Sequence, residues 1–335
     1  MEINKKAISR FLKNQIQNCR ILVIGDMMLD QYLYGVADRI SPEAPVLVNS
    51  IQRRQNKLGG SANVVHNLVK MGCQVLAAGQ IGNDTHGRIL TNMMQQLQVS
   101  TEGLIIGKAP TITKIRVLAG QQQLVRLDFE ETTAIDQGTE NQIVDYAEKQ
   151  IDKGLSAIIL SDYHKGICTE SLCQRIIALA RRHHILTFID PKGNYWKKYS
   201  GADFITPNVK ELGEAVNEKI ANERECVLPI AQKIMTDLNI KNIMVTRSEK
   251  GLSLVLPERD VTIPTQAREV YDVSGAGDTV LAAFSAGISG NLLPEEAAYM
   301  ANLAAGIGVE KVGTYAVGQD EILERLIYDE KILDY

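Results

Sequence analysis

The sequence predicts an α/β fold, in which helices cover both faces of a mostly parallel sheet and a small second sheet projects from it. Two observations predict this fold. Short apolar runs rich in β-branched residues alternate with stretches of helical periodicity along most of the 335 residues. Residues 32–51 and 111–129 break that alternation and are typical of strands with no long helix between them. Because no repeat or linker-like stretch divides the chain, we expect a single domain over residues 1–335.

The individual elements follow from the same periodicities. The predicted strands of the main sheet lie at residues 21–24, 75–81, 157–160, 185–189 and 242–245. The predicted helices between them lie at residues 63–71, 89–97, 141–153, 169–182 and 228–238. Two long helices are expected to close the chain, one after Gly277 and one over residues 294–309. In the second irregular region, alternation on both sides of Gly120 predicts a β-hairpin.

Composition and charge argue against several classes of function. Hydrophobic residues make up 45% of the chain and charged residues 23%, as in an ordinary globular enzyme. The formal charge of −4 gives no general attraction to a phosphate backbone, so we expect no nucleic-acid partner. No apolar run approaches the roughly 20 residues that span a bilayer, and residues 1–20 lack a secretory signal, so we expect a cytoplasmic protein without membrane contact. The five cysteines form no CxxC pair, which indicates reduced thiols; zinc bound by Cys168, Cys173 and His164 is a weaker alternative.

The most informative motif is DVSGAGDT at residues 272–279, which an apolar helical stretch follows. Gly275 and Gly277 let the backbone approach a ligand closely, and the free N–H groups where the helix begins attract negative charge. Asp278, in the first turn, can take a proton from a hydroxyl that attacks a phosphoryl group held there. A simple turn with a helix-dipole partner is the alternative for this motif alone. Rossmann dehydrogenases and P-loop kinases are disfavoured, because the third glycine of the dinucleotide fingerprint and the P-loop pattern are both missing.

Two further segments are candidates for a sugar site. Gly59 and Gly60 precede a predicted helix, and Asn63 within it offers both a donor and an acceptor. The acidic segment 25–30 follows the first predicted strand, where open α/β sheets place ligand-binding residues, and Asp30 can accept hydrogen bonds from hydroxyls. A solvated loop or a helix cap is the alternative for each segment.

Together, the blocks near residues 60 and 275 resemble the two signatures of the ribokinase-like (PfkB) carbohydrate kinases, in the same order and at a similar distance. This resemblance implies a ribokinase-like three-layer sandwich with a small β-sheet lid. Runs such as GDMMLDQYLYG, RISPEAPV, TITKIRVL, LSDYHKG, TPNVKE and EVYDVSGAGDT are similar to the branch of the family that uses ATP to phosphorylate the anomeric O1 of D-glycero-β-D-manno-heptose 7-phosphate in ADP-heptose biosynthesis. Some members of this branch carry a fused nucleotidyltransferase domain. Residues 1–335 lack its His-x-Gly-His motif, so we expect either a kinase-only protein or the kinase portion of a longer one.

The resemblance also implies residue roles. Asp278 is the implied catalytic base, with an anion hole formed by the backbone of Gly275, Ala276 and Gly277. The residues implied to hold sugar hydroxyls are Asp30, Gly59, Gly60 and Asn63. Those implied to contact ATP are Lys192, Asn208, Glu211, Thr246, Arg247, Gly251 and Asn302, with Asn208 and Glu211 positioning Mg²⁺ through water. Residues 311–314 fall where some relatives bind a monovalent cation, and the pairing of lids in relatives implies a homodimer.

A phosphorylated substrate also needs cationic partners. Lys114, Arg116 and Arg126, on the predicted lid strands, are the candidates, and Arg39 is a weaker one. Charges that discourage edge pairing of the lid are the alternative. Two other functions stay open: a related kinase for a different sugar, sugar phosphate or nucleoside, and a catalytically inactive sugar-binding regulator. The presence of Asp278 argues against the regulator, because binding alone needs no base.

Overall fold

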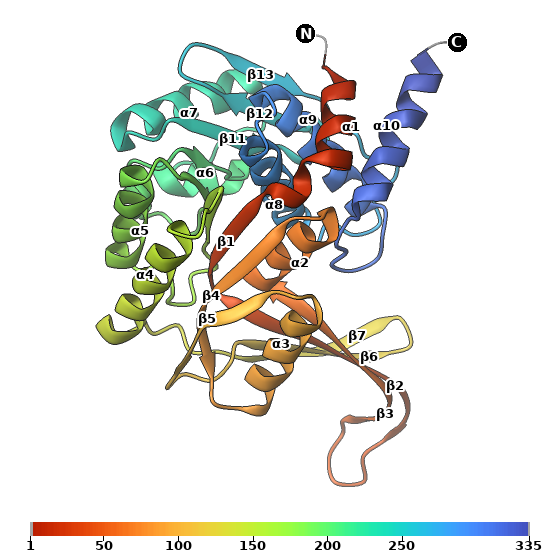
Figure 1. The fold of residues 1–335 in the computed structure, drawn as a ribbon. Coiled ribbons are helices and arrows are strands. Elements are labelled where there is room, and N and C mark those ends of the chain that lie inside the picture. Colours follow the sequence, from red (N-terminus) through yellow and green to blue (C-terminus); the bar gives the residue numbers. More distant parts are fainter. Residues whose placement is uncertain (1–2, 334–335) are drawn as a thin grey trace.

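The computed structural model describes residues 3–333, with side chains through residue 327, and its main sheet has nine strands in the order β13-β12-β11-β10-β9-β8-β1-β4-β5 (Figure 1). Neighbouring strands run parallel from β5 to β11, while β12 and β13 are antiparallel at one edge. The strands are β1 (Arg20–Gly25), β4 (Gln74–Gly82), β5 (Ser100–Gly107), β8 (Ala157–Ser161), β9 (Leu186–Asp190), β10 (Phe204–Ile205), β11 (Asn242–Thr246), β12 (Leu252–Val255) and β13 (Asp260–Ile263). The predicted mostly parallel sheet is therefore confirmed.

The sheet separates two hydrophobic cores, because successive side chains of a strand point to opposite faces. On β1, Ile21 and Val23 belong to one core, and Leu22 and Ile24 belong to the other. The first core is covered by α1 (Lys5–Asn14), α2 (Ser61–Met71), α3 (Thr85–Gln96), α8 (Ala276–Ser289), α9 (Pro294–Val309) and α10 (Gln319–Leu333). The second is covered by α4 (Gln137–Ile151), α5 (Glu170–Arg182), α6 (Val209–Val216) and α7 (Arg224–Leu238). These two helical layers and the sheet make up the predicted three-layer sandwich (Figure 1).

The prediction that two helices close the chain is wrong, because α10 follows α8 and α9. Ile322 and Leu326 on α10 are buried against the first core. The sequence analysis also missed α1, α6 and the strands β5, β10, β12 and β13. The elements that it did predict all appear, with bounds shifted by a few residues.

The lid is a separate four-stranded sheet with the strand order β3-β2-β6-β7, and it extends away from the sandwich (Figure 1). Its strands are β2 (Met27–Ile40), β3 (Leu47–Gly60), β6 (Thr113–Ala119) and β7 (Gln122–Phe129). The predicted hairpin is confirmed, with Gly120 at a φ of +59° between β6 and β7. Strands β2 and β3 are longer than predicted. Strand β3 ends at Gly60 and α2 begins at Ser61, so the lid joins α2 without a loop.

Two other findings concern the chain as a whole. Among the helices of residues 3–333, none combines the length and the apolar character needed to cross a bilayer. The five cysteines are free, as expected for reduced thiols.

Candidate active site

The start of α8 brings a carboxylate and unused amide groups together. Gly275 precedes the helix at a φ of +81°, a conformation that glycine adopts without strain. The Ala276 amide donates to Val273 O, which leaves the N–H groups of Gly277 and Asp278 as the first-turn donors that the helix does not use. Of the three predicted anion-hole residues, Gly275 and Gly277 therefore keep amides without an acceptor among the described residues, while the Ala276 amide is used.

Asp278 is buried, and both of its carboxylate oxygens accept hydrogen bonds. Asn63 Nδ2 donates to Oδ2 at 2.7 Å, and the Tyr163 hydroxyl donates to Oδ1 at 2.5 Å. Burial raises the pKa of Asp278 to about 6, although these two hydrogen bonds favour the ionised form. A pKa near 6 suits a general base, because the group is ionised at neutral pH and still binds a proton well.

Tyr163 was missed by the sequence analysis, although it lies in the run LSDYHKG just after β8. Burial, followed by the nearby Asp278 charge, raises the pKa of Tyr163 well above its usual value, so the phenol remains a donor. The buried Asp26 carboxylate fixes this loop by accepting from the backbone N–H groups of Tyr163, Lys165 and Ile167 at 2.9, 3.1 and 3.2 Å. Asp26 thus supports the residue that orients Asp278.

The predicted sugar-side residues meet at the junction of the lid with α2. Asp30 lies on β2 opposite β3, and a Cβ on Gly59 would lie 2.3 Å from Asp30 Oδ2. Gly60, at a φ of +53°, directs the chain into α2, which carries Asn63. Only a residue without a side chain leaves room for the Asp30 carboxylate at position 59. The structure therefore places Asp30, Gly59, Gly60 and Asn63 at one junction.

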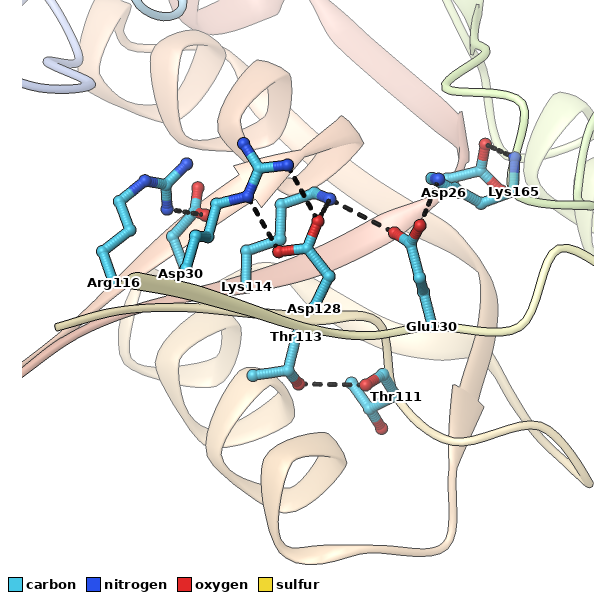
Figure 2. Close-up of polar contacts among 10 residues, drawn as sticks. Asp26, Asp30, Thr111, Thr113, Lys114, Arg116, Asp128, Glu130 and Lys165 are labelled. Carbon is cyan, nitrogen blue, oxygen red and sulfur yellow. Dashed lines mark hydrogen bonds and ion pairs between the residues drawn. The ribbon is translucent and has the colours of Figure 1, made fainter. Parts of the chain in front are cut away.

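The lid cations form ion pairs with carboxylates on the same sheet and its flank (Figure 2). Arg116 Nη1 contacts Asp30 Oδ1 at 2.5 Å. The remaining contacts join Lys114 to Asp128 and Glu130, Arg126 to Asp128, and Lys165 to Glu130. Each of the three predicted phosphate-binding cations therefore already has an anionic partner. Arg39 lies on the exposed outer part of β2.

A groove of about 1150 Å³ lies on the α6 side of the site. Its lining includes Asn208 and Thr246, two of the predicted nucleotide residues. Asn208 caps α6, and it forms a capping box with Glu211 in which each side chain accepts from the other residue's N–H at 2.9 Å. Lys192 Nζ contacts Glu211 Oε1 at 2.8 Å, so the predicted Lys192, Asn208 and Glu211 do form one group.

Three other predicted nucleotide residues contact neighbouring parts of the protein and fall outside the described lining of this groove. Arg247 is buried, and its guanidinium donates to Asn222 and to Ser253 Oγ. Asn302, on α9, donates to Pro264 O. A Cβ on Gly251 would lie 2.0 Å from Ile263 O, and its φ is +79°. The hydrogen bonds of Arg247 and Asn302 join separate strands and loops, and Gly251 allows the close approach of Ile263 O.

The structure also bears on the predicted cations. Among the described side chains of residues 3–327, no three His, Cys, Asp or Glu groups converge as a metal site would require, which removes the zinc alternative. In the segment proposed for a monovalent cation, Thr314 O accepts from Lys57 Nζ at 3.0 Å, and the Gly313 amide donates to Asp272. An ammonium group therefore already occupies one carbonyl of that segment.

A buried carboxylate beside free amides at a helix start, in an α/β sandwich with a lid, defines a small-molecule kinase. Comparison with known proteins agrees. The model of the "pfkB family carbohydrate kinase" matches residues 19–321, so the chain belongs to that family and is an ATP-dependent sugar kinase. It is 43% identical to "Bifunctional protein HldE" of Syntrophotalea carbinolica over 98% of this chain and 68% of that protein. It is 42% identical to the protein of the same name from Geobacter sulfurreducens over 91% of this chain and 62% of that one. The chain thus spans about two thirds of the length of these relatives.

Solved structures support the fold. Escherichia coli phosphofructokinase-2 in its tetrameric inhibited form superposes with a TM-score of 0.75 at 18% identity, covering 92% of this chain and 99% of that one. Arabidopsis thaliana ribokinase complexed with ribose and ATP gives a TM-score of 0.72 at 18% identity, covering 92% and 98%. The expected ribokinase-like fold is therefore confirmed.

Proposed function

We propose that this kinase transfers the γ-phosphate of ATP to the anomeric O1 of D-glycero-β-D-manno-heptose 7-phosphate and so forms the 1,7-bisphosphate. The observation that carries the proposal is the Asp278 carboxylate, held by Asn63 and Tyr163 beside the first amides of α8. The choice of heptose rests on the sequence runs shared with that branch of the family, together with the similarity to the HldE proteins.

In the proposed reaction, Asp278 takes the proton of the O1 hydroxyl while O1 attacks the γ-phosphorus. The bond from O1 to phosphorus forms, the bond from the γ-phosphorus to the bridging oxygen breaks, and ADP leaves. The amide of Gly277, with Gly275 and Ala276 around it, stabilises charge on the transferring group. Asp30, Gly59 and Gly60 position the sugar, and Asn63 orients the base in addition to contacting the sugar.

ATP is proposed to lie in the groove beside α6, next to Thr246, with Lys192 near its phosphates. Arg247, Gly251 and Asn302 would support the wall of this groove from outside its described lining. Asn208 and Glu211 would position Mg²⁺ through water, since carboxylate and amide oxygens suit this hard cation and it retains several of its waters. The Mg²⁺ would neutralise triphosphate charge, and Lys192 supplies a second positive charge at the same place.

The test is an assay of ADP release with heptose 7-phosphate, comparing the wild type with Asp278→Asn. We expect turnover in the wild type and a loss of about 10²- to 10⁴-fold in the variant, the usual contribution of a general base. A panel of other sugars and nucleosides is assayed in parallel. Faster turnover of another acceptor would reject heptose as the substrate, and sugar binding without ADP release from any acceptor would reject the kinase activity.

We also propose that the protein is a homodimer through its lids. Exposed apolar side chains of the lid support this, namely Val36, Ile40, Leu47, Ile51, Val125, Leu127 and Phe129. On β7, Val125, Leu127 and Phe129 alternate with Arg126 and Asp128, and Asp128 forms ion pairs with both Arg126 and Lys114. Sedimentation at micromolar concentration is expected to show a dimer that Leu127→Glu dissociates; a monomeric wild type would contradict the proposal.

A further inference from the structure

A second pocket, of about 460 Å³, adjoins the catalytic base. Its lining residues are Gln55, Asn56, Lys57, Leu58, Asn63, His66, Lys70, Met93, Gln96, Leu97, Thr314, Tyr315 and Ala316. We call it the Lys57–Lys70 pocket. One of its residues, Asn63, donates to Asp278, and another, Thr314, lies 3.4 Å from the position of a Cβ on Gly275. The pocket therefore adjoins Asn63 and Thr314, which lie beside the proposed base and the start of α8.

The charged side chains in the described lining of the pocket are all basic. It contains two lysines and a histidine, and its described lining contains no Asp or Glu. Lys57 donates to a backbone carbonyl and forms no ion pair among the described residues, although Asp30 faces it across the β2–β3 pair. Neither His66 nor Lys70 has a side-chain hydrogen bond or ion pair within residues 3–327. Burial, followed by the charges of Lys70 and Lys57, lowers the pKa of His66 to about 4, so this imidazole is neutral at pH 7.

The three predicted phosphate-binding cations of the lid, in contrast to Lys57 and Lys70, all form ion pairs. Arg116 and Arg126 each contact a carboxylate, and Lys114 contacts two. A phosphate that bound there would have to compete with those carboxylates or displace them, and it would bring its own negative charge close to theirs. In the Lys57–Lys70 pocket a phosphate would meet two lysines that form no ion pair among the described residues, although the charges of Asp30 and Asp272 also act on Lys57.

The spacing of residues on α2 determines how a ligand would lie in the pocket. Asn63, His66 and Lys70 are spaced three and then four residues apart, so they share one face of the helix. At a rise of 1.5 Å per residue, Lys70 lies about 10 Å along the axis from Asn63. A ligand that places a hydroxyl at Asp278 and extends along α2 therefore presents its far end to Lys70.

We propose that the Lys57–Lys70 pocket binds the phosphate group that the sugar acceptor already carries. The acceptor would lie with its reacting hydroxyl at Asp278 and its phosphate between Lys57 and Lys70, with Asn56 and the unprotonated His66 as additional polar contacts. This inference rests on the proposed function, because it requires an acceptor that already carries a phosphate. It differs from the sequence-based assignment, which placed that phosphate on Lys114, Arg116 and Arg126.

The test compares Lys57→Met and Lys70→Met with Lys114→Met and Arg126→Met, and Lys153→Met serves as a matched control on the exposed surface after α4. Heptose 7-phosphate is the acceptor. We expect each of the first two variants to raise the KM for the acceptor about ten-fold or more, as for loss of a hydrogen bond to a charged group, with little change in kcat or in the KM for ATP. A raised acceptor KM in the Lys114 or Arg126 variant, with none in the Lys57 and Lys70 variants, would overturn the proposal.

A binding measurement separates this inference from the proposed function. Isothermal titration of inorganic phosphate into the wild type and into the Lys57→Met/Lys70→Met double variant requires no turnover. If the double variant loses phosphate binding and Lys153→Met retains it, the result supports the Lys57–Lys70 pocket as a phosphate site. This holds even if the enzyme releases no ADP with heptose 7-phosphate. Equal binding by all three proteins, or no binding by the wild type at millimolar phosphate, overturns it.

Discussion

Replacing Tyr163 with Phe removes one of the two hydrogen bonds to the proposed base and leaves the ring in place. The phenol donates to Asp278 Oδ1 at 2.5 Å and favours the ionised carboxylate. A hydrogen bond to a charged group contributes about 1.5–3 kcal/mol, and about 1.4 kcal/mol corresponds to one pKa unit. Because the lost bond stabilised the charged form, the pKa of Asp278 must rise above its present value of about 6. We therefore expect the acidic limb of the pH profile of kcat/KM to move up by about one pH unit.

The assay is kcat/KM for the sugar acceptor between pH 5 and 9. If the limb moves by one pH unit, activity relative to the wild type falls about three-fold at pH 6.5 and about eight-fold at pH 5.5, and it recovers above about pH 8. Tyr195→Phe is the matched control, because Tyr195 donates to Glu170 at the exposed surface. An unchanged limb in Tyr163→Phe, or the same loss at every pH, would refute the view that this phenol tunes the base.

Three further predictions follow from the same contacts. The pKa of Asp278 rises from 3.8 to about 6, so its ionised form costs up to about 3 kcal/mol of folding stability above pH 6. This cost is absent below pH 3.8, where the carboxyl is protonated. Asp278→Asn should therefore lose turnover, still bind ATP and melt no lower than the wild type at pH 7.5 in a thermal-shift assay. Gly59→Ala should raise the acceptor KM and spare the KM for ATP, because its methyl group displaces the Asp30 carboxylate, whereas Gly308→Ala makes only ordinary contacts and should leave both KM values unchanged. Asn208→Ala should destabilise the fold by about 1 kcal/mol and Asn208→Ser should not, since serine also caps helices; if the amide helps to position Mg²⁺, both variants should raise the KM for MgATP.

How much of the fold could be predicted depended on how much of each element is apolar. Strand β1 is buried on both faces and stands out as an apolar run, so it was located to within a residue. Helix α1 has three buried residues, Ile8, Phe11 and Leu12, among lysines and other polar residues, so the segment was described only as polar and charged. Strand β10 contains only Phe204 and Ile205. A pattern this short has no measurable period, and its pairing with β9 and β11 decides its structure.

The candidate site could be predicted where a backbone conformation dictates the residue type. Gly60 and Gly275 have positive φ angles, and such positions leave a visible glycine motif. The contact between Asn63 and Asp278 joins residues 215 positions apart, and no local pattern encodes it. Tyr163 was missed for the same reason, because a tyrosine after a buried strand is equally compatible with a structural role. The partner of each side chain is set by tertiary packing, which the motifs do not specify.

The acidic side chains around the proposed phosphate-transfer site place a condition on its ligand. Burial, and then the charges of Glu211 and Asp278, raise the pKa of Asp190 well above its usual value, so negative charge is already disfavoured here. A triphosphate would add several more negative charges. Lys192 offsets part of this repulsion, but it is paired with Glu211. We therefore expect ATP to bind together with a cation that offsets the negative charge of the triphosphate and of these carboxylates. This is the physical reason why Glu211 and Asn208 are proposed to act on Mg²⁺ and not directly on the phosphates.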